Sequence, residues 1–254
     1  MFKENKEFWL YIIGTVIMLI VIYLVVNNYQ FPFVGFLTDQ GRDSLVYNQL
    51  PLMQLEEGKD YRARIATNNG DILIDLYEDK APQTVNNFVF LAEEGYYQDV
   101  SFHRVIRDFL IQTGSRTTLD DDPSNDAMGE PGYVFDDEIN WDSLGLSMEQ
   151  RQTLEEAGYS NDTHVESRRL EKYSVAMANA GPDTNGSQFF IVLADDTDSR
   201  LRVLQGRHTV FGTIIGGYDV LRTINNVPIE NEEDDSVSRP RGNYFIEAVE
   251  IQIL

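Results

Sequence analysis

The segment from Val175 to Phe190, which reads VAMANAGPDTNGSQFF, constrains the possible folds more than any other part of the chain. Small residues fill its first half between Ala176 and Gly181, and small side chains let another chain lie close to the backbone. Turn residues follow, first Gly-Pro-Asp and then Asn-Gly, which fix φ or require it to be positive. The run Phe-Phe-Ile-Val-Leu that comes next is typical of a buried strand. The pattern predicts a flat backbone ledge beside an aromatic strand, an arrangement that suits an extended peptide.

Two further motifs lie on either side of this segment. Upstream, the chain reads Phe-His-Arg-Val-Ile from residue 102 and Phe-Leu-Ile-Gln from residue 109; downstream, it reads Gly-Arg-His-Thr-Val-Phe-Gly from residue 206. Together the three ordered motifs resemble the cyclophilins, the cyclosporin-binding class of peptidyl-prolyl cis-trans isomerases. The resemblance runs from about Tyr61 to the C-terminus. With the N-terminal segment described below, the chain is most similar to a bacterial-like, membrane-anchored member of that family.

Composition excludes several classes of partner and site. The chain has 254 residues, of which 42 are acidic and 20 basic, giving a formal net charge of −22. Such a chain is repelled by phosphate backbones and by anionic membrane surfaces, so nucleic acid is not an expected partner. The sequence contains no Cys, which excludes disulfides, thiolate nucleophiles and cysteine metal sites. The three histidines lack metal-ligand spacing, and we expect neither a metal nor a cofactor.

An uncharged run from Phe8 to Val26 predicts a transmembrane helix. As a helix it would span roughly 28 Å, close to the ~30 Å hydrocarbon core of a bilayer. Lys3 and Lys6 precede the run, so the positive-inside rule places residues 1–7 in the cytoplasm and the rest of the chain outside. The alternative is a cleaved secretory signal, but its apolar region would normally be shorter, and no Ala-x-Ala cleavage site follows. Either reading exports the remainder of the chain.

Residues 27–58 are interpreted as a connector, and residues 59–254 as one isomerase domain. Phe31, Phe33 and Phe36 of the connector could lie in the membrane interface or pack on the domain, and the pattern does not decide between these positions. The connector is therefore assigned from its place between the anchor and the first predicted strand.

Alternation of polar and apolar residues predicts a mainly β domain. Residues 61–67 and 71–77 alternate around Asn-Asn-Gly, a hairpin signal. A helix should open at Pro82 and close at Gly95, and a second should occupy residues 218–225. Many short strands and two amphipathic helices predict a closed antiparallel barrel with helices over its ends. The count of eight strands and two helices is what the resemblance implies.

Residues 139–173 form an insertion that is longer than in compact cyclophilins. Within it, Ser147 and Gln150 predict a capping box for a short surface helix near residues 148–157. A structural embellishment is favoured over a partner-binding site for this insertion.

The loop at residues 117–132 is rich in Asp and Glu, whose oxygens are the ligands that calcium prefers. The spacing of these residues does not match an EF-hand, so a solvated acidic loop is favoured over a calcium site.

Rotation about an X–Pro bond needs no nucleophile, metal or proton relay, because no bond is broken. The resemblance assigns Arg104 as a cationic donor to the prolyl nitrogen. It assigns the remaining roles as follows: Phe109, Leu110, Phe190 and Leu204 as the proline pocket, His208 at its edge, Gln112, Asn179 (through its backbone) and Gln188 as groups that position the peptide, and His103 and Ala178 as groove lining. Of these, Arg104, Phe109, Gln112, Phe190 and His208 are the expected catalytic residues.

Two departures from the family pattern affect these expectations. Val203 stands where the family usually has Trp or Phe, so weak cyclosporin binding is expected. Gln112 is followed by Thr113-Gly114 in place of a glycine pair, so the geometry beside Gln112 is expected to differ from the family pattern. The leading hypothesis is an anchored isomerase that helps exported proteins fold and binds their proline-containing segments. The alternatives are a membrane-tethered proline-peptide binding module or chaperone with little catalysis, and a structural barrel in a membrane assembly.

Overall fold

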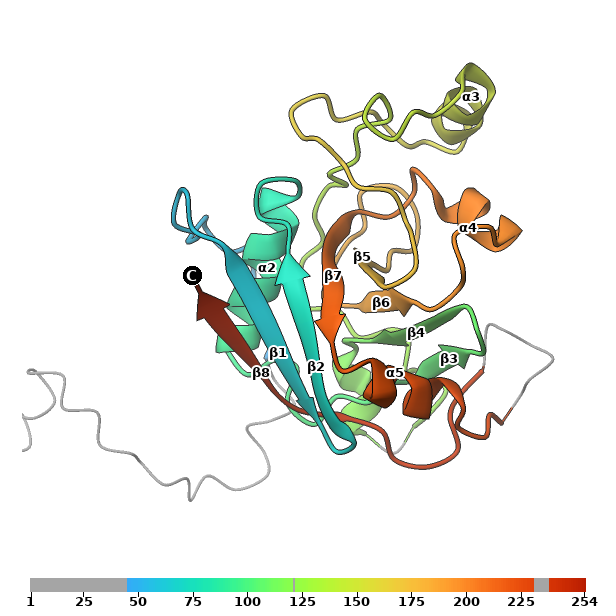
Figure 1. Cartoon of the computed structure of the whole chain (residues 1–254). Coiled ribbons are helices and arrows are strands. Elements are labelled where there is room, and N and C mark those ends of the chain that lie inside the picture. Colours follow the sequence, from blue (N-terminus) through green and yellow to red (C-terminus); the bar gives the residue numbers. More distant parts are fainter. Residues whose placement is uncertain (1–44, 121, 231–237) are drawn as a thin grey trace, which may run out of the picture. The chain divides into compact units, whose positions relative to one another are not determined.

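Eight strands and a few short helices make up the part of the chain that the structure, a computed structural model, describes: residues 45–120, 122–230 and 238–254 (Figure 1). The strands are β1 (Tyr61–Thr67), β2 (Gly70–Leu76), β3 (Arg104–Ile106), β4 (Leu110–Thr113), β5 (Ser174–Met177), β6 (Phe189–Val192), β7 (Val210–Gly216) and β8 (Ile246–Ile253). The helices are α2 (Pro82–Glu93), the 3-10 turn η2 (Arg116–Leu119), α3 (Met148–Glu156), α4 (Ser199–Leu204) and α5 (Tyr218–Asn225).

The strands form one antiparallel sheet in the order β3-β4-β6-β5-β7-β2-β1-β8, curled into a half-barrel. The prediction of a mainly β fold with eight strands is confirmed. Full closure of the barrel is not found among the described residues, where the edge strands β3 and β8 do not pair. The edges approach at an isolated bridge between Ser101 and Phe245, and the Phe102 amide donates to the Tyr244 carbonyl over 2.8 Å. The outer edge of β3 meets Ser238 instead of β8, because the Val105 amide donates to the Ser238 carbonyl over 2.8 Å.

The first hairpin and the first helix begin where the sequence predicts. β1 and β2 pair through Thr67 and Gly70, and the Thr67 hydroxyl donates to the Gly70 carbonyl over 2.6 Å. α2 starts at Pro82, which needs no hydrogen-bond partner for its nitrogen. The preceding residue, Ala81, cannot cap the helix with its side chain. That role falls to Glu138, whose carboxylate accepts from backbone amides in the first turn of α2.

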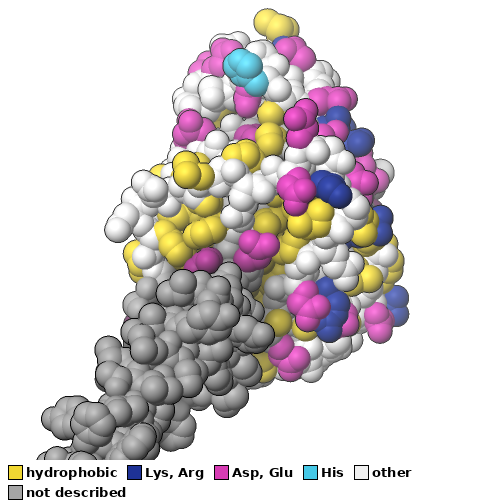
Figure 2. All heavy atoms as spheres, turned by 90° about the vertical axis from the view of Figure 1, so that its left-hand side faces the viewer, with side chains coloured by type: hydrophobic (Ala, Val, Ile, Leu, Met, Phe, Trp, Pro, Cys, Tyr) yellow, Lys and Arg dark blue, Asp and Glu magenta, His cyan; other side chains and the backbone are white. Residues whose placement is uncertain are grey.

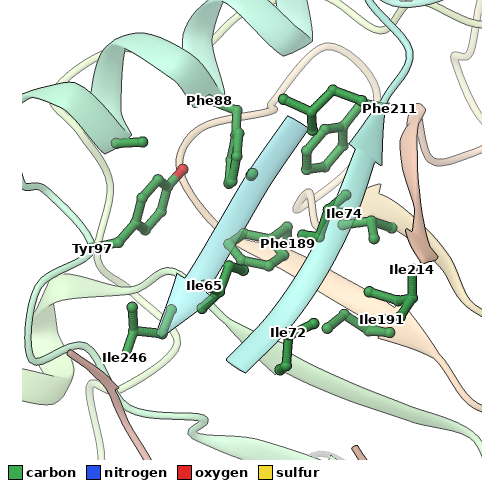
Figure 3. Packing of buried hydrophobic residues seen from close by; sticks show 14 of the residues in the cluster. Ile65, Ile72, Ile74, Phe88, Tyr97, Phe189, Ile191, Phe211, Ile214 and Ile246 are labelled. Atoms are coloured by element: carbon green, nitrogen blue, oxygen red, sulfur yellow. The ribbon is translucent and has the colours of Figure 1, made fainter. Parts of the chain in front are cut away.

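The interior of the half-barrel is filled by aliphatic and aromatic side chains (Figure 3). Phe88 of α2 contacts Phe189 of β6 edge-on, with ring centroids 5.6 Å apart, and lies 5.3 Å from Phe211 of β7. Ile191 of β6 points into the same core. Because successive side chains of a strand point to opposite faces, Phe190 points to the other face of the sheet. The continuous apolar run of β6 therefore reflects burial on both faces, and the outer face is available for a site.

The insertion at residues 139–173 builds a small hydrophobic cluster of its own. Its buried members are Ile139, Trp141, Leu144, Leu146, Leu154 and Tyr159. The predicted capping box is confirmed, because the Ser147 hydroxyl accepts from the Gln150 amide and the Gln150 side chain accepts from the Ser147 amide. A side chain at Gly206 would collide with Leu154, so the insertion packs closely against the loop after α4. α4 itself is not predicted from the sequence.

Residues 45–58, the described part of the predicted connector, pack on the domain. Leu45, Tyr47, Leu50 and Leu55 are partly buried against the core, and the Tyr47 ring lies 5.0 Å from that of Phe90. The described part of the predicted connector is therefore in contact with the domain, and the predicted boundary at residue 59 stays a prediction. The predicted anchor at residues 8–26 and the aromatic residues at 31–36 lie outside the described residues. No helix within the described residues combines the length and apolarity needed to cross a bilayer.

The side of the molecule that carries β1 and β8 has a mixed surface (Figure 2). Hydrophobic and acidic side chains are interspersed there, and basic side chains lie beside acidic ones. Arg62 and Arg64 of β1, for example, form ion pairs of 2.9 and 3.0 Å with Asp75 and Asp71 of β2. Positive charge on this face is thus locally neutralised.

Candidate functional site

A groove of about 380 Å³ lies on the outer face of the sheet. It is lined by Arg104, Phe109, Leu110, Gln112, Ala127, Glu130, Ala178, Asn179, Ala180, Gln188, Phe190, Leu204 and His208. They come from β3, from β4 and the residue before it, from β6 and the residue before it, from α4, and from the loops at 127–130, 178–180 and 208. Ten of the eleven residues that the resemblance assigns to a site therefore meet in one groove.

Strand register explains how the central side chains come together. Arg104 of β3 pairs with Gln112 of β4, Gln112 pairs with Phe190 of β6, and Phe190 pairs with Ala176 of β5. Directly paired residues of an antiparallel sheet share a face, so this row crosses four strands on the groove side. Ala176 is fully buried at the end of the row, and its small side chain leaves room above it.

The apolar part of the groove rests on a second hydrophobic cluster, separate from the barrel interior. Phe109, Leu110 and Phe190 belong to it and are each less than 10% exposed, and Leu204 packs against it. The Arg200 guanidinium lies over the Phe109 ring, 4.2 Å from its centroid, which fixes the ring by a cation–π contact. The result is an apolar pocket whose aromatic walls are themselves buried and packed.

A chain of hydrogen bonds orients the polar side of the groove. Arg104 Nη1 donates to Gln112 Oε1 over 3.1 Å, and Gln112 Nε2 donates to Gln188 Oε1 over 3.1 Å. Gln188 Nε2 in turn donates to the carbonyls of Ala127 and Gly129, at 2.9 and 3.2 Å. Because a guanidinium can only donate and a carbonyl can only accept, both amide side chains have a single consistent orientation. Arg104 is thereby held beside the apolar pocket.

His208 closes the edge of the pocket as a neutral imidazole. Its Nδ1 lies 3.0 Å from the Met177 carbonyl, and since a carbonyl accepts, Nδ1 carries the proton. The ring stands edge-on to Phe190, with centroids 5.2 Å apart. Burial lowers the pKa of His208 from 6.5 to about 4, with a smaller opposing contribution from the Met177 hydrogen bond. His208 therefore borders the pocket as a neutral ring, and not as a cation at neutral pH.

The small-residue ledge is held by one backbone hydrogen bond and by the side chain of Asn179. The Ala178 amide donates to the Gln188 carbonyl over 2.9 Å, continuing the sheet past β5. The Asn179 side chain donates to the Arg207 carbonyl over 2.8 Å and lies 3.4 Å from the Asp137 carboxylate. These contacts occupy the side chain of Asn179, which agrees with a role for this residue through its backbone.

The structure places two of the residues singled out above outside the groove. His103 is 6% exposed and is not among the groove-lining residues. Val203 is 64% exposed and lines a different hollow, between α3 and α4.

Thr113 is accommodated where the family has glycine because its hydroxyl donates to the Ser101 carbonyl over 2.9 Å. The following Gly114 has φ of +94°, and an added Cβ would lie 2.4 Å from the Ser187 carbonyl, so only the second position demands glycine.

Three groove residues were not anticipated from the sequence: Ala127, Glu130 and Ala180. Ala127 and Glu130 belong to the acidic loop, whose composition is typical of a solvated loop. Only Gln188 could have indicated that this loop enters the groove, because a buried side-chain amide needs hydrogen-bond acceptors. The sequence pattern does not indicate that residues about 60 positions upstream supply those acceptors.

Comparison with known proteins agrees with this geometry. The family model for cyclophilin type peptidyl-prolyl cis-trans isomerases matches residues 62–251. The chain is 38% identical to peptidyl-prolyl cis-trans isomerase-like 2 of Rhizopus delemar, over 67% of this chain and 26% of that protein. It is 37% identical to peptidyl-prolyl cis-trans isomerase ppi1 of Schizosaccharomyces pombe, over 69% of this chain and 89% of that protein.

A solved structure shares the fold. It is the cyclophilin type peptidyl-prolyl cis-trans isomerase of Cryptosporidium parvum, with a TM-score of 0.55 and 28% identity, covering 76% of this chain and 98% of that one. The same protein was also solved in the presence of the dipeptide Ala-Pro, with a TM-score of 0.54. The chain spans about a quarter of the first relative's length and most of the second's. These are eukaryotic proteins, so the expected likeness to bacterial members stays a prediction. On the family model, the relatives and the fold together, the chain belongs to the family of cyclophilin type peptidyl-prolyl cis-trans isomerases.

Proposed function

We propose that this protein is a peptidyl-prolyl cis-trans isomerase that acts on proline-containing segments of exported proteins. The observation that carries the proposal is the position of Arg104, a cation held by Gln112 beside an apolar pocket. A proline ring in the pocket of Phe109 and Phe190 would bring its nitrogen within reach of this cation. The Cryptosporidium parvum relative, solved in the presence of Ala-Pro, supports a proline-containing ligand.

The required rate enhancement sets the scale of the mechanism. An unaided X–Pro bond rotates over a barrier of about 18–20 kcal/mol. A turnover of ~10³ s⁻¹ corresponds to a barrier near 13 kcal/mol, so the groove must supply roughly 5–7 kcal/mol. One charge-assisted hydrogen bond contributes ~1.5–3 kcal/mol net. Arg104 can therefore supply part of the effect, and the pocket and ledge supply the rest by holding the proline ring while the acyl side turns.

Arg104 is expected to act on the twisted amide. Loss of amide resonance leaves a lone pair on a pyramidal prolyl nitrogen, and a guanidinium N–H can donate to it. Planar cis and trans amides offer no such lone pair, so the contact is stronger at the top of the barrier, which is the condition for acceleration. Gln112, Gln188 and the backbone at Asn179 would align the peptide, and the neutral His208 would border the ring.

The rival function is a binding module with little catalysis. It would need the apolar pocket and the ledge but no cation, so the ordered position of Arg104 favours the isomerase. A proline-peptide isomerisation assay on the purified full-length chain separates the two. The isomerase predicts catalysed cis–trans exchange at micromolar protein, whereas saturable peptide binding without exchange would establish the binding module.

We further propose that residues 8–26 anchor the protein in a membrane, with residues 1–7 in the cytoplasm and the isomerase domain outside. The support is the uncharged run itself and the lysines at positions 3 and 6. In this setting the clients would be exported proteins that fold near the membrane surface. The insertion at residues 139–173 is proposed to be a structural embellishment, since six of its apolar residues are buried in a cluster that the insertion forms by itself.

A further inference from the structure

One carboxylate stands in the groove without a role in the chemistry above. Glu130 lines the groove together with Arg104, Gln188 and Ala180. Its side chain is exposed as a whole, but its carboxyl end turns inward onto Gly186: a Cβ built on that glycine would lie 1.7 Å from Glu130 Oε2. The missing side chain at Gly186 therefore makes the space in which the carboxylate lies.

The loop that carries Glu130 is fixed from two sides. Gln188 donates to the carbonyls of Ala127 and Gly129, and the Gly129 amide donates to the Ser115 hydroxyl over 2.9 Å. A Cβ at Gly129 would lie 2.5 Å from that hydroxyl, so the approach is close. Because Gln188 also belongs to the hydrogen-bond chain from Arg104, the positions of the carboxylate and the guanidinium are coupled through one side chain.

The charge on Glu130 is not neutralised within the described residues. No hydrogen bond or ion pair reaches its carboxylate from any of them, and burial alone raises its pKa to about 7. A carboxylate that is partly removed from water and has no ion-pair partner gains more from an incoming cation than a fully solvated one does. The groove thus contains groups of both charges, because a guanidinium and a carboxylate are both among its lining residues.

We propose that Glu130 is a specificity residue, which selects proline segments carrying a lysine or arginine within three residues of the proline. The inference rests on the proposed function, because it concerns the same groove. An extended peptide advances about 3.3 Å per residue, and a lysine or arginine side chain reaches further than that, so a basic residue near the proline can meet the carboxylate. A neutral or acidic residue there forgoes the ion pair or meets a like charge. The formal net charge of −22 adds a general attraction for basic clients, which salt would screen.

The test compares host peptides with one proline and a single varied residue at positions −3 to +3, which is lysine, norleucine or glutamate. Cis–trans exchange is measured by NMR with the full-length chain at low salt. We expect kcat/KM for lysine to exceed that for norleucine about three- to fivefold at one position, the effect of a partly exposed ion pair. The ratio should fall to about one in Glu130→Gln and should persist in Glu149→Gln. Glu149 is an exposed acid in the hollow between α3 and α4, so its variant changes the net charge equally.

The outcomes separate this inference from the proposed function. Equal lysine-to-norleucine ratios in the wild type and in Glu130→Gln would overturn the assignment of Glu130, even if every peptide is isomerised. If no peptide is isomerised, the proposed function fails. The ratio of the dissociation constants of the norleucine and lysine peptides, compared between the wild type and Glu130→Gln, then decides the inference. Absence of binding to every peptide would overturn both.

Discussion

Glu138 reaches across more than 50 residues to cap α2, and removing its carboxylate should destabilise the whole domain. Glu138 Oε2 accepts from the Thr84 amide at 2.8 Å and from the Thr84 hydroxyl at 2.7 Å, and Oε1 accepts from the Gln83 amide at 3.0 Å. Thr84 is fully buried, so neither water nor Ala81 can replace the lost acceptor in Glu138→Ala.

Loss of a helix cap costs ~1–2 kcal/mol, and each buried donor left without an acceptor costs ~1–3 kcal/mol. Burial raises the pKa of Glu138 despite its three donors, so desolvation already offsets part of the gain. We therefore expect Glu138→Ala to lower the free energy of unfolding by about 3 kcal/mol. Glu138→Gln should lose about half of that, since one amide oxygen still accepts.

Urea denaturation followed by circular dichroism measures these losses. Glu156→Ala, at an exposed position of α3, is the matched control and should change the free energy of unfolding by less than ~0.5 kcal/mol. A loss below about 1 kcal/mol in Glu138→Ala would contradict the account of how α2 is capped, because it would mean that another group satisfies the Thr84 donors.

Three further predictions concern pH, drug binding and topology. The His208 pKa of about 4 lies below its unfolded value of 6.5, so folding favours the neutral ring. The contribution of the neutral ring to stability is therefore lost as the pH falls from 6.5 towards 4. ¹⁵N NMR should show a neutral ring protonated at Nδ1 at pH 6, and a charged ring at that pH would refute this. Val203 offers neither the area nor the N–H of an indole, so cyclosporin should inhibit the protein weakly and Val203→Trp should be inhibited more strongly; tight inhibition of the unmodified protein would refute the argument. Protease added outside intact cells or spheroplasts should digest the domain and leave the anchor in the membrane, whereas a protected domain would disprove the proposed topology.

Most of the groove residues could be predicted from the sequence, because they lie in short motifs that are recognisable without knowledge of distant contacts. Phe109, Leu110 and Gln112 share one strand and its preceding turn, and Phe190 follows the turn-rich segment directly. The alternation of β6 between the core and the groove could be expected once both of its faces were known to be buried.

The features that escaped prediction depend on contacts between distant residues. Glu130 enters the groove only because Gln188 and Ser115 hold its loop, and Glu138 caps α2 from another part of the chain. α4 was missed because it is six residues long with one buried residue, Leu201, so it leaves almost no periodic pattern. The break between β3 and β8 likewise involves a distant contact, because the Ser238 carbonyl accepts from the Val105 amide at the outer edge of β3.

The role of Arg104 is tested by comparing the activities of two matched variants, Arg104→Ala and Arg202→Ala. Arg104 is partly buried in the groove, whereas Arg202 is exposed on α4 and lines the neighbouring hollow. Each variant removes one positive charge, so a general electrostatic effect should appear in both. Arg104→Lys keeps the charge but loses the planar fork of donors, and it should recover only part of the activity.

The most direct test of the isomerase mechanism is kcat/KM for a proline peptide in Arg104→Ala, measured beside the dissociation constant of the same peptide. Because ~1.4 kcal/mol is a factor of ten and the lost contact should exceed that, we expect kcat/KM to fall at least tenfold. The dissociation constant should rise much less, since the pocket and ledge remain, and Arg202→Ala should resemble the wild type. Full activity in a folded Arg104→Ala protein would contradict the mechanism and favour the binding module.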